Sequence, residues 1–271
     1  MSPWLLAMDV DGTILTKDYT VPHDVREEIQ RARASGVVAV LVTARAPRSV
    51  FHILDAVGGI DAAICYGGAL TLTHEDGAWR PDETATGMQV SAAAVREVVL
   101  RCREAGVSLA VYGADHVHVD ELDPTLREEF ANTGLTAIEG DLLAMPEPAL
   151  KLLAIGDERT MPVLEELRRA FGRQLACLYS HTNYLEIMHK DVSKGSALDR
   201  YRGALGIARE KVVAIGDSEN DLSMFAAAAM PIAMGNAIDT VKQAARWVTE
   251  TNANSGVAVA LRRCADTLWS A

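Results

Sequence analysis

Four acidic side chains and one lysine are the residues in this sequence whose types and spacing could do chemistry. Asp9 and Asp11 are separated by one residue in "MDVDGT", directly after an apolar stretch. Asp217 and Asp221 occur in "GDSEND", after another apolar run. Lys194 lies in "DVSKGSAL", where we expect a helix to begin. If the four carboxylates converge, they repel one another strongly unless a cation lies between them.

The oxygen ligands of such a cluster suit Mg²⁺, which binds one or two carboxylates together with phosphate oxygens of a substrate. The metal, Lys194 and backbone N–H groups could then neutralise a phosphate in an otherwise acidic protein. Thr43 could donate its hydroxyl to a phosphate oxygen, and Gly12 allows close backbone approach. No serine or cysteine stands beside a histidine in these loops, so the available nucleophile is an aspartate. One aspartate would attack phosphorus, and its neighbour would transfer the proton.

The elements that must position these residues share one design: a short apolar run, a polar turn, and then a helical pattern. Near-continuous apolar runs are typical of strands that are buried on both faces of a parallel sheet. Ligands of such sheets bind beyond the carboxyl ends of the strands, so polar residues at those ends converge. We therefore predict a doubly wound, Rossmann-like α/β core. The runs are "WLLAM" before Asp9 and Asp11, "GVVAVLV" before Thr43 and Arg45, "DAAICY" before Gly67 and Gly68, and "KVVAI" before Asp217, Ser218, Asn220 and Asp221.

The middle of the chain has an α+β pattern. A helical stretch around Val98 and Cys102 precedes "VSLAVYGADHVHVD", which is typical of a hairpin that turns at 113–115. Further helices and the strands "KLLAIGD", "LACLYSH" and "YLEIMHK" follow. We predict that residues 1–82 and 184–271 form the core and that 83–183 form an inserted cap that determines substrate specificity. The segment "WRPDET" would be the entry linker.

The composition limits the class of partner. The chain has 37 acidic and 26 basic residues, a net charge of -11, which opposes binding to nucleic acid or to an anionic membrane. Its four cysteines form no CxxC pair, and no apolar run reaches membrane-spanning length. We expect a cytoplasmic protein that binds a small phosphate ester and neither nucleic acid nor membrane; its oligomeric state stays open.

With these motifs in order, the chain resembles a phosphatase of the haloacid dehalogenase superfamily. "DVDGT" matches the first motif of that family, Thr43 the second, Lys194 in "SKG" the third, and "GDSENDLSM" the fourth. The insert after "YGGAL" and the tail "AMGNA…TNANSGVA" resemble the Cof-like subgroup with a type IIB cap. The resemblance covers the whole length of the chain.

The resemblance implies a role for each matched residue. Asp9 would be the nucleophile and Asp11 the general acid and base, while Thr43 and Lys194 would hold the phosphoryl group. The implied Mg²⁺ ligands are Asp9, Asp11 through its backbone carbonyl, Asp217 and Asp221, and the implied phosphate or substrate contacts are Gly12, Ala44, Arg45 and Asn220. Two positions depart from the family pattern. Ala44 replaces the usual glycine of the second motif, and Tyr66 and Gly67 replace a usual asparagine.

Several alternatives stay open from the sequence. Asp221 could be a metal ligand or a helix-terminal acid, and Arg45 a substrate clamp or a surface residue. His116 and His118 alternate on one strand face, but without a third ligand nearby we expect a solvated or hydrogen-bonded pair. The protein could also be a phosphomutase or a noncatalytic phosphate-binding regulatory module. Sugar phosphates, phosphorylated cofactors such as pyridoxal phosphate, and nucleotides are all possible substrates.

Overall fold

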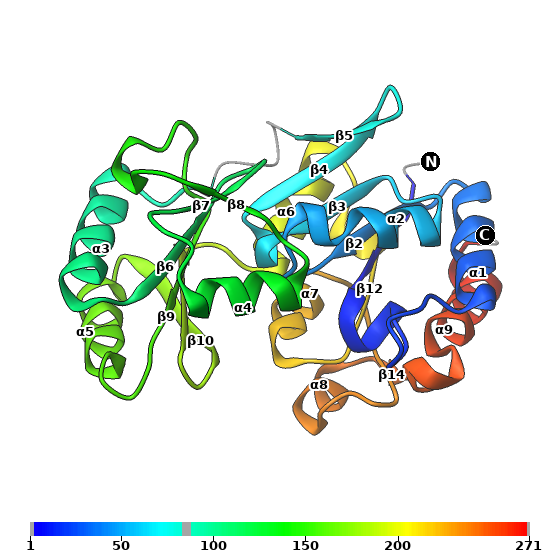
Figure 1. The fold of residues 1–271 in the computed structure, drawn as a ribbon. Helices are drawn as coiled ribbons and strands as arrows, with labels where there is room; N and C mark the ends of the chain where they lie inside the picture. Colours follow the sequence, from blue (N-terminus) through cyan, green and yellow to red (C-terminus); the bar gives the residue numbers. More distant parts are fainter. Residues whose placement is uncertain (1–2, 83–87, 270–271) are drawn as a thin grey trace. The chain divides into compact units, whose positions relative to one another are not determined.

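The computed structural model describes residues 3–82 and 88–269, and the chain divides into two compact units (Figure 1). The first unit, the core, comprises Met1–Ala46, Val50–Thr86 and Ser193–Ala271. The second unit, the cap, comprises Gly87–Val192 together with Pro47–Ser49. Each unit contains its own sheet, so an α+β module is inserted into an α/β one, as the sequence predicted.

The core contains an eight-stranded sheet in the order β14-β13-β12-β1-β2-β3-β4-β5. Its pairs from β14 through β3 are parallel, which confirms the predicted doubly wound core. The strands are β1 (Leu5–Met8), β2 (Val38–Val42), β3 (Ala62–Cys65), β4 (Leu70–Glu75), β5 (Ala78–Pro81), β12 (Val212–Gly216), β13 (Met230–Ala233) and β14 (Trp247–Val248).

The first strand occupies the centre of this sheet. Leu5 of β1 pairs with Val212 of β12 on one side and with Val38 of β2 on the other. All four residues of β1 and all five of β12 are buried, because helices cover both faces of a doubly wound sheet. The chain that leaves β1 therefore emerges beside the chain that leaves β12, and both enter the candidate site.

Helices precede or follow the parallel strands of the core. They are α1 (His23–Ala34), α2 (Phe51–Val57), α6 (Lys194–Ala204), α7 (Leu222–Ala226), α8 (Asp239–Ala244) and α9 (Gly256–Cys264). Helix α1 buries Val25, Ile29 and Ala32, which share one face of the helix. Helix α2 ends at Gly58, which has a φ of 63°. The helical patterns expected after the apolar runs of β1, β2 and β12 are therefore present as α1, α2 and α7.

The far edge of the core sheet is antiparallel, which the sequence did not suggest. Strand β4 pairs antiparallel with β3 and with β5. Strand β5 contains Trp79, Arg80 and Pro81, the first half of the predicted linker "WRPDET". This half is therefore a strand, and Pro81 is tolerated there because β5 is an edge strand. Residues 83–84 of the predicted linker lie outside the described residues.

The cap contains a six-stranded sheet in the order β10-β11-β9-β6-β7-β8. Its strands are β6 (Ser108–Tyr112), β7 (Val117–Val119), β8 (Ala137–Glu139), β9 (Lys151–Ile155), β10 (Leu175–His181) and β11 (Tyr184–His189), and its helices are α3 (Ala92–Ala105), α4 (Pro124–Thr133) and α5 (Met161–Phe171). Val98 of α3 and Leu164 of α5 share one apolar cluster with sheet residues such as Leu152. The predicted hairpin is present as β6 and β7.

The second boundary of the cap differs from the prediction. We expected the core to resume at residue 184, but β11 pairs with β10 and β9 and belongs to the cap sheet. The chain divides at Ser193 instead. The short apolar run of β11 does not by itself reveal which sheet it joins, because both sheets offer apolar faces. Strand β8, which pairs in parallel with β7, was also missing from the prediction.

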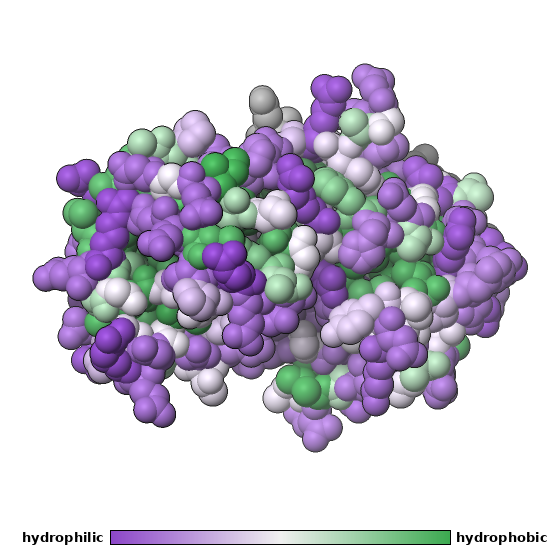
Figure 2. All heavy atoms as spheres, viewed as in Figure 1, coloured by the Kyte–Doolittle hydropathy of each residue, from purple (hydrophilic) through white to green (hydrophobic). Residues whose placement is uncertain are grey.

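The face of the molecule in Figure 2 is mostly hydrophilic. Apolar residues form scattered areas on it. Among the described helices, none is both long enough and apolar enough to cross a membrane.

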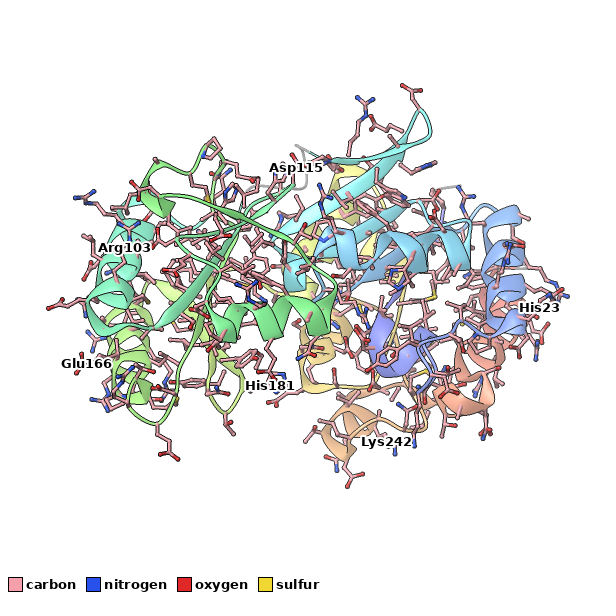
Figure 3. All side chains as sticks on the ribbon, in the orientation of Figure 1. His23, Arg103, Asp115, Glu166, His181 and Lys242 are labelled. Carbon is pink, nitrogen blue, oxygen red and sulfur yellow. The ribbon has the colours of Figure 1, made fainter. Side chains whose placement is uncertain are left out.

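An ion-pair network joins three segments at the surface of the cap. Arg103, labelled on α3 in Figure 3, donates two hydrogen bonds to Asp120 and one of 2.6 Å to Asp141. Asp120 also accepts the backbone N–H of Leu142 at 3.0 Å. The hydrogen bonds from the Arg103 guanidinium hold the pKa of Asp120 below its ordinary value.

Candidate active site

Three carboxylates converge at the carboxyl ends of β1 and β12. Asp9 follows β1 and donates its backbone N–H to Ile215 of β12 at 3.0 Å. Asp217 follows β12 directly. One carboxylate oxygen from each of Asp9, Asp217 and Asp221 lies within 4.8 Å of the others. The convergence that the parallel sheet predicted is therefore present for these three acids.

Asp221 is fixed by the turn that follows β12. It is fully buried, and its Oδ2 accepts the backbone N–H groups of Asp217 at 2.9 Å and Ser218 at 3.0 Å. These bonds orient the other oxygen, Oδ1, toward Lys194. Asp221 thus stabilises the turn with one carboxylate oxygen and lies in the acidic cluster with the other.

Lys194 brings the only amino group in contact with this cluster among the described residues. It is the first residue of α6, which begins with a capping box between Ser193 and Ser196. Its Nζ lies 2.5 Å from Asp9 Oδ1 and 2.6 Å from Asp221 Oδ1, and the residue is 2% exposed. The start of this helix therefore positions a buried cation between two acids.

The charges of the cluster do not balance. Burial raises the pKa of Asp9 to about 8, and the neighbouring charges of Asp221 and Asp217 also raise it, although Lys194 opposes the shift. Burial likewise raises the pKa of Asp217. Ionisation of all three acids beside a single ammonium therefore requires an additional cation. Oxygen donors of this kind fit a hard divalent ion, so the residues present suit a metal site.

Gly12 allows the loop after β1 to reach Asp217. Its φ is +77°, and a Cβ atom at this position would lie 2.3 Å from Asp217 Oδ2. Thr13, the next residue, donates its hydroxyl to Asp217 Oδ1 at 3.0 Å. Both the backbone conformation and the close approach require glycine here. The predicted residue Gly12 therefore belongs to the site through its backbone.

Asp11 has a different environment from Asp9. Its carboxylate forms a bidentate pair with Arg45, with Nε 2.8 Å from Oδ2 and Nη2 2.6 Å from Oδ1. The Asp11 side chain is half exposed, whereas Asp9 is buried. The Asp11 carboxylate is therefore not part of the acidic cluster. It pairs with Arg45 instead.

The end of β2 places the second motif at the same edge of the sheet. Thr43 is buried and donates its backbone N–H to Ile64 at 2.8 Å. Its hydroxyl oxygen accepts the backbone N–H of Arg45 at 3.1 Å and keeps its own proton for donation. Ala44 is exposed and has no positive φ, so alanine fits this position without strain.

Asn220 contacts its neighbour through its side chain, whereas the "YGG" segment contacts the second motif through its backbone. Asn220 is exposed, and its side-chain oxygen accepts the hydroxyl of Ser218 at 2.9 Å. Tyr66 is buried and, like Gly67, has a positive φ. Gly67 donates its backbone N–H to the carbonyl of Thr43 at 2.9 Å. The "YGG" segment therefore supports the second motif through its backbone.

Two asparagines near the end of the chain anchor the loop after β1, and sequence reasoning assigned no role to them. Asn236 donates to the carbonyl of Gly12 at 2.8 Å and accepts the backbone N–H of Asn252 at 2.9 Å. Asn252 donates to the buried carbonyl of Leu15 at 2.7 Å. The signal was the tail "AMGNA…TNAN", where two asparagines follow apolar segments.

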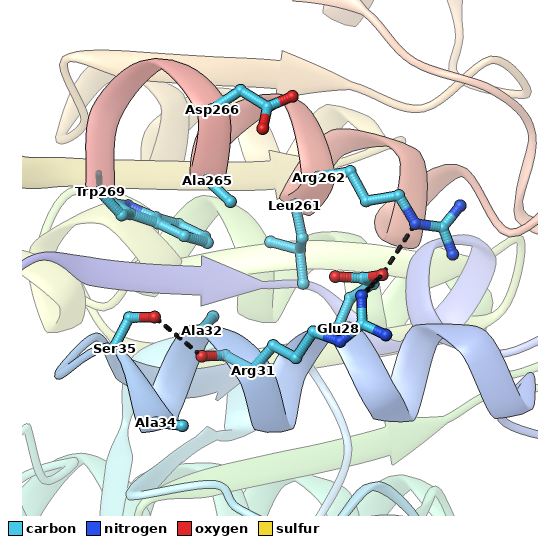
Figure 4. A pocket seen from close by; sticks show the side chains of 10 residues that line it. All are labelled: Glu28, Arg31, Ala32, Ala34, Ser35, Leu261, Arg262, Ala265, Asp266 and Trp269. Carbon is cyan, nitrogen blue, oxygen red and sulfur yellow. Dashed lines mark hydrogen bonds and ion pairs between the residues drawn. The ribbon is translucent and has the colours of Figure 1, made fainter. Parts of the chain in front are cut away.

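A separate pocket of the core lies between α1 and α9 (Figure 4). Glu28 at its rim accepts hydrogen bonds from Arg31 at 3.0 Å and from Arg262 at 2.8 Å. None of the predicted site residues lines this pocket. It is therefore distinct from the acidic cluster.

This chain is similar to known proteins along nearly its whole length. A family model described as haloacid dehalogenase-like hydrolase matches residues 6–261. Bacillus subtilis YitU, named as a 5-amino-6-(5-phospho-D-ribitylamino)uracil phosphatase, is 28% identical over 94% of this chain and 95% of its own length. Escherichia coli YbhA, named as a pyridoxal phosphate phosphatase, is 28% identical over 95% of this chain and 97% of its own. The solved structure of Thermotoga maritima TM0651 has a TM-score of 0.86 and 26% identity, over 96% of this chain and 97% of that one.

Proposed function

This chain belongs to the haloacid dehalogenase-like hydrolases, as its motifs predicted, and from that premise we propose that it hydrolyses a small phosphate monoester through an aspartyl-phosphate at Asp9. The observation that carries the proposal is the buried contact of Asp9 with Lys194, beside Asp217 and Asp221. In-line attack on an anionic phosphoryl group needs a nucleophile with positive charge beside it. Asp9 would be that nucleophile, and the Lys194 ammonium and a cation bound by the cluster would supply the charge.

Asp9 forms the first new bond in the proposed reaction. Its carboxylate oxygen attacks phosphorus while the bond from phosphorus to the ester oxygen breaks. Water then attacks the same phosphorus, the bond to Asp9 breaks, and inorganic phosphate leaves. Lys194 contacts Asp9 Oδ1 and so stands where it can stabilise charge on the transferred group.

Asp11 moves the proton in both steps of the proposed reaction. Asp11 must enter the first step protonated: its carboxylic acid gives that proton to the leaving alkoxide, and the resulting carboxylate takes a proton from the attacking water in the second step, which restores the acid. Arg45 holds both Asp11 oxygens, so it positions the carboxyl group and must release one oxygen for proton transfer. Arg45 is in this way a positioning residue for Asp11, in place of the substrate clamp that the sequence also allowed.

The remaining predicted residues would bind the phosphoryl group and the metal. Thr43 would donate its hydroxyl, and the backbone N–H groups of Gly12 and Ala44 and the Asn220 amide would be further donors. Mg²⁺ would be held by Asp9, the backbone carbonyl of Asp11, Asp217 and Asp221. When bound, it would neutralise the carboxylates and polarise the phosphoryl oxygens.

The substrate class that we propose is a sugar phosphate or a phosphorylated cofactor. Two relatives that match the chain along its length are named for a phosphorylated ribityl compound and for pyridoxal phosphate. Both compounds carry a phosphate monoester on a small polar molecule. The net charge of -11 argues against a polyanionic nucleic acid substrate.

The test is turnover of an aryl phosphate and of a panel of phosphometabolites with Mg²⁺, ranked by kcat/KM. Asp9→Asn keeps the shape of the side chain but removes the nucleophile, so we expect turnover to disappear while the fold is retained. Asp55→Asn changes an exposed acid on α2 and is the matched control. Substantial residual turnover in the Asp9→Asn variant would refute the proposal.

The same assay separates hydrolysis from phosphoryl transfer. Hydrolysis releases one inorganic phosphate for each ester consumed, whereas a mutase yields an isomer without release. We expect stoichiometric release. Absence of turnover across the whole panel would instead support a noncatalytic binding module.

A further inference from the structure

A second cluster of metal-ligating side chains lies in the cap, where the sequence suggested only a histidine pair. Glu147 is near His116 and His118, and one potential ligand atom from each of the three lies within 4.8 Å of the others. His118 and Glu147 are 29 positions apart in the sequence. The third ligand therefore comes from the loop before β9, which the local pattern of "HVH" could not reveal.

The three donor atoms already lie close together. Glu147 Oε1 lies 2.7 Å from His118 Nε2 and 3.4 Å from His116 Nδ1. The donors of a tetrahedral zinc site stand about 3.3 Å apart, given metal–donor distances of about 2.0–2.1 Å. Binding therefore requires only a small opening of the contact between His118 and Glu147.

The surroundings of Glu147 orient its carboxylate. Its Oε2 accepts the backbone N–H of Asp115 at 3.2 Å, which turns Oε1 toward the histidines. Burial raises the pKa of Glu147, but hydrogen bonds from His118 and the Asp115 N–H outweigh this effect and lower it overall. The carboxylate is therefore ionised at neutral pH and ready to act as a ligand.

The hairpin turn is shaped around this carboxylate. Gly113 at the end of β6 donates its N–H to the carbonyl of His116 at 2.9 Å. A Cβ atom on Gly113 would lie 2.1 Å from the Glu147 carboxyl group, so glycine is what admits Glu147 to the turn. His118 is buried whereas His116 is half exposed, which leaves one side of the cluster open to a metal from solution.

We propose that His116, His118 and Glu147 form a binding site for a transition-metal dication, with Zn²⁺ as the best match. Two imidazoles and one carboxylate suit zinc, with a water as the fourth ligand, whereas Mg²⁺ prefers oxygen ligands alone. The bound ion would link the turn between β6 and β7 to the loop before β9. The site is independent of the acidic cluster of the core and of the proposed reaction.

The test is calorimetric titration of the full-length protein with Zn²⁺ in excess Mg²⁺, which is added to compete with Zn²⁺ for the acidic cluster of the core. His116→Ala removes a half-exposed ligand. Glu147→Gln keeps the size of the side chain and an acceptor for the Asp115 N–H, so at least one variant retains the fold. His181→Ala is the matched control, because β11, β9 and β6 separate β10 from β7 in the sheet. Figure 3 labels Asp115 near the upper edge of the cap and His181 near its lower edge in that view.

We expect one zinc equivalent whose dissociation constant rises at least about 10-fold in His116→Ala and in Glu147→Gln but not in His181→Ala. Co²⁺ added to the wild type should give the visible absorption of a tetrahedral site, and both ligand variants should lose it. Identical titrations of the wild type and the ligand variants would overturn the proposal. Failure of the wild type to bind zinc under these conditions would also overturn it.

Discussion

Lys194 Nζ lies 2.5 Å from Asp9 Oδ1, although 185 positions separate the two residues in the sequence. The same ammonium also contacts Asp221 at 2.6 Å, so one cation serves two buried acids. The two acids and the lysine come from segments on either side of the cap insertion. The cluster is consequently complete only when both parts of the core have folded together.

Replacement of Lys194 by methionine should impair both catalysis and stability. The variant leaves buried carboxylates without their ammonium, so we expect the free energy of unfolding to fall by about 3 kcal/mol. The kcat/KM for an aryl phosphate should fall at least about 100-fold. Lys242→Met, on α8, is the control and should retain both values. Wild-type kcat/KM in Lys194→Met would contradict the proposed role.

Replacement of Gly12 by alanine should lower kcat/KM in addition to the stability that is lost through backbone strain. Gly12 and Gly77 have nearly the same φ, +77° and +79°, but only at Gly12 would a Cβ meet another group, the Asp217 carboxylate. Each alanine variant should lose about 1–2 kcal/mol of stability from the left-handed conformation. Only Gly12→Ala should lose about 100-fold in kcat/KM, because Asp217 must move. Equal activities of the two variants would show that the position of Asp217 is unimportant.

The hydrogen bond from Asn252 to Leu15 should stabilise the loop that carries Asp9. Asn252→Asp keeps the size of the side chain but cannot donate to the buried carbonyl. Urea unfolding should show a loss of about 1–3 kcal/mol, at least as large as in Asn252→Ala. Asn254→Asp changes an exposed residue two positions away and should stay within about 0.5 kcal/mol of the wild type. A near-neutral Asn252→Asp variant would mean that the donor is dispensable.

The stability that Asp120 contributes to the cap should depend on pH. Hydrogen bonds from Arg103 lower the pKa of Asp120 in the folded protein. Its contribution is therefore fully present above the pKa of the unfolded chain, about 3.9, and is lost as the pH falls through the folded value. The difference in unfolding free energy between the wild type and Asp120→Asn should be at most about 1 kcal/mol near neutral pH, since the pair is partly exposed.

Urea unfolding of the wild type and Asp120→Asn near neutral pH and at about pH 3 measures this difference. It should shrink at the lower pH, and in a background of Arg103→Met it should be small at both values. A difference that persists unchanged at low pH would contradict the assignment.

The sequence predicted the parts of the molecule that depend on local pattern. Apolar runs located β1 and β12, and the rule that ligands bind at the carboxyl ends of parallel strands brought Asp9, Asp217 and Asp221 together. The order of the motifs identified the family. These inferences succeeded because buried parallel strands and the turns after them leave strong local signals.

The parts that were not predicted depend on contacts between distant segments. The pairing of Asp11 with Arg45, the support of Leu15 by Asn252, and the approach of Glu147 to His118 all join loops that sequence spacing does not relate. The cap boundary at Ser193 has the same origin, because the sheet that β11 joins is decided by its partners. The local pattern predicts whether such a residue is buried or exposed. Its contact partner depends on tertiary packing between distant segments.

The position of β1 between β2 and β12 affects the order in which the two sheets can form while the chain is synthesised on the ribosome. Residues 108–189 supply every strand of the cap sheet as one continuous stretch, so that sheet can close while the chain is still being made. One edge of strand β1 has no partner until residues 212–216, which form β12, leave the ribosome. Pairing of such widely separated strands is slow, since a long loop must close first. The order of the strands therefore allows the cap sheet to form before the core sheet is complete.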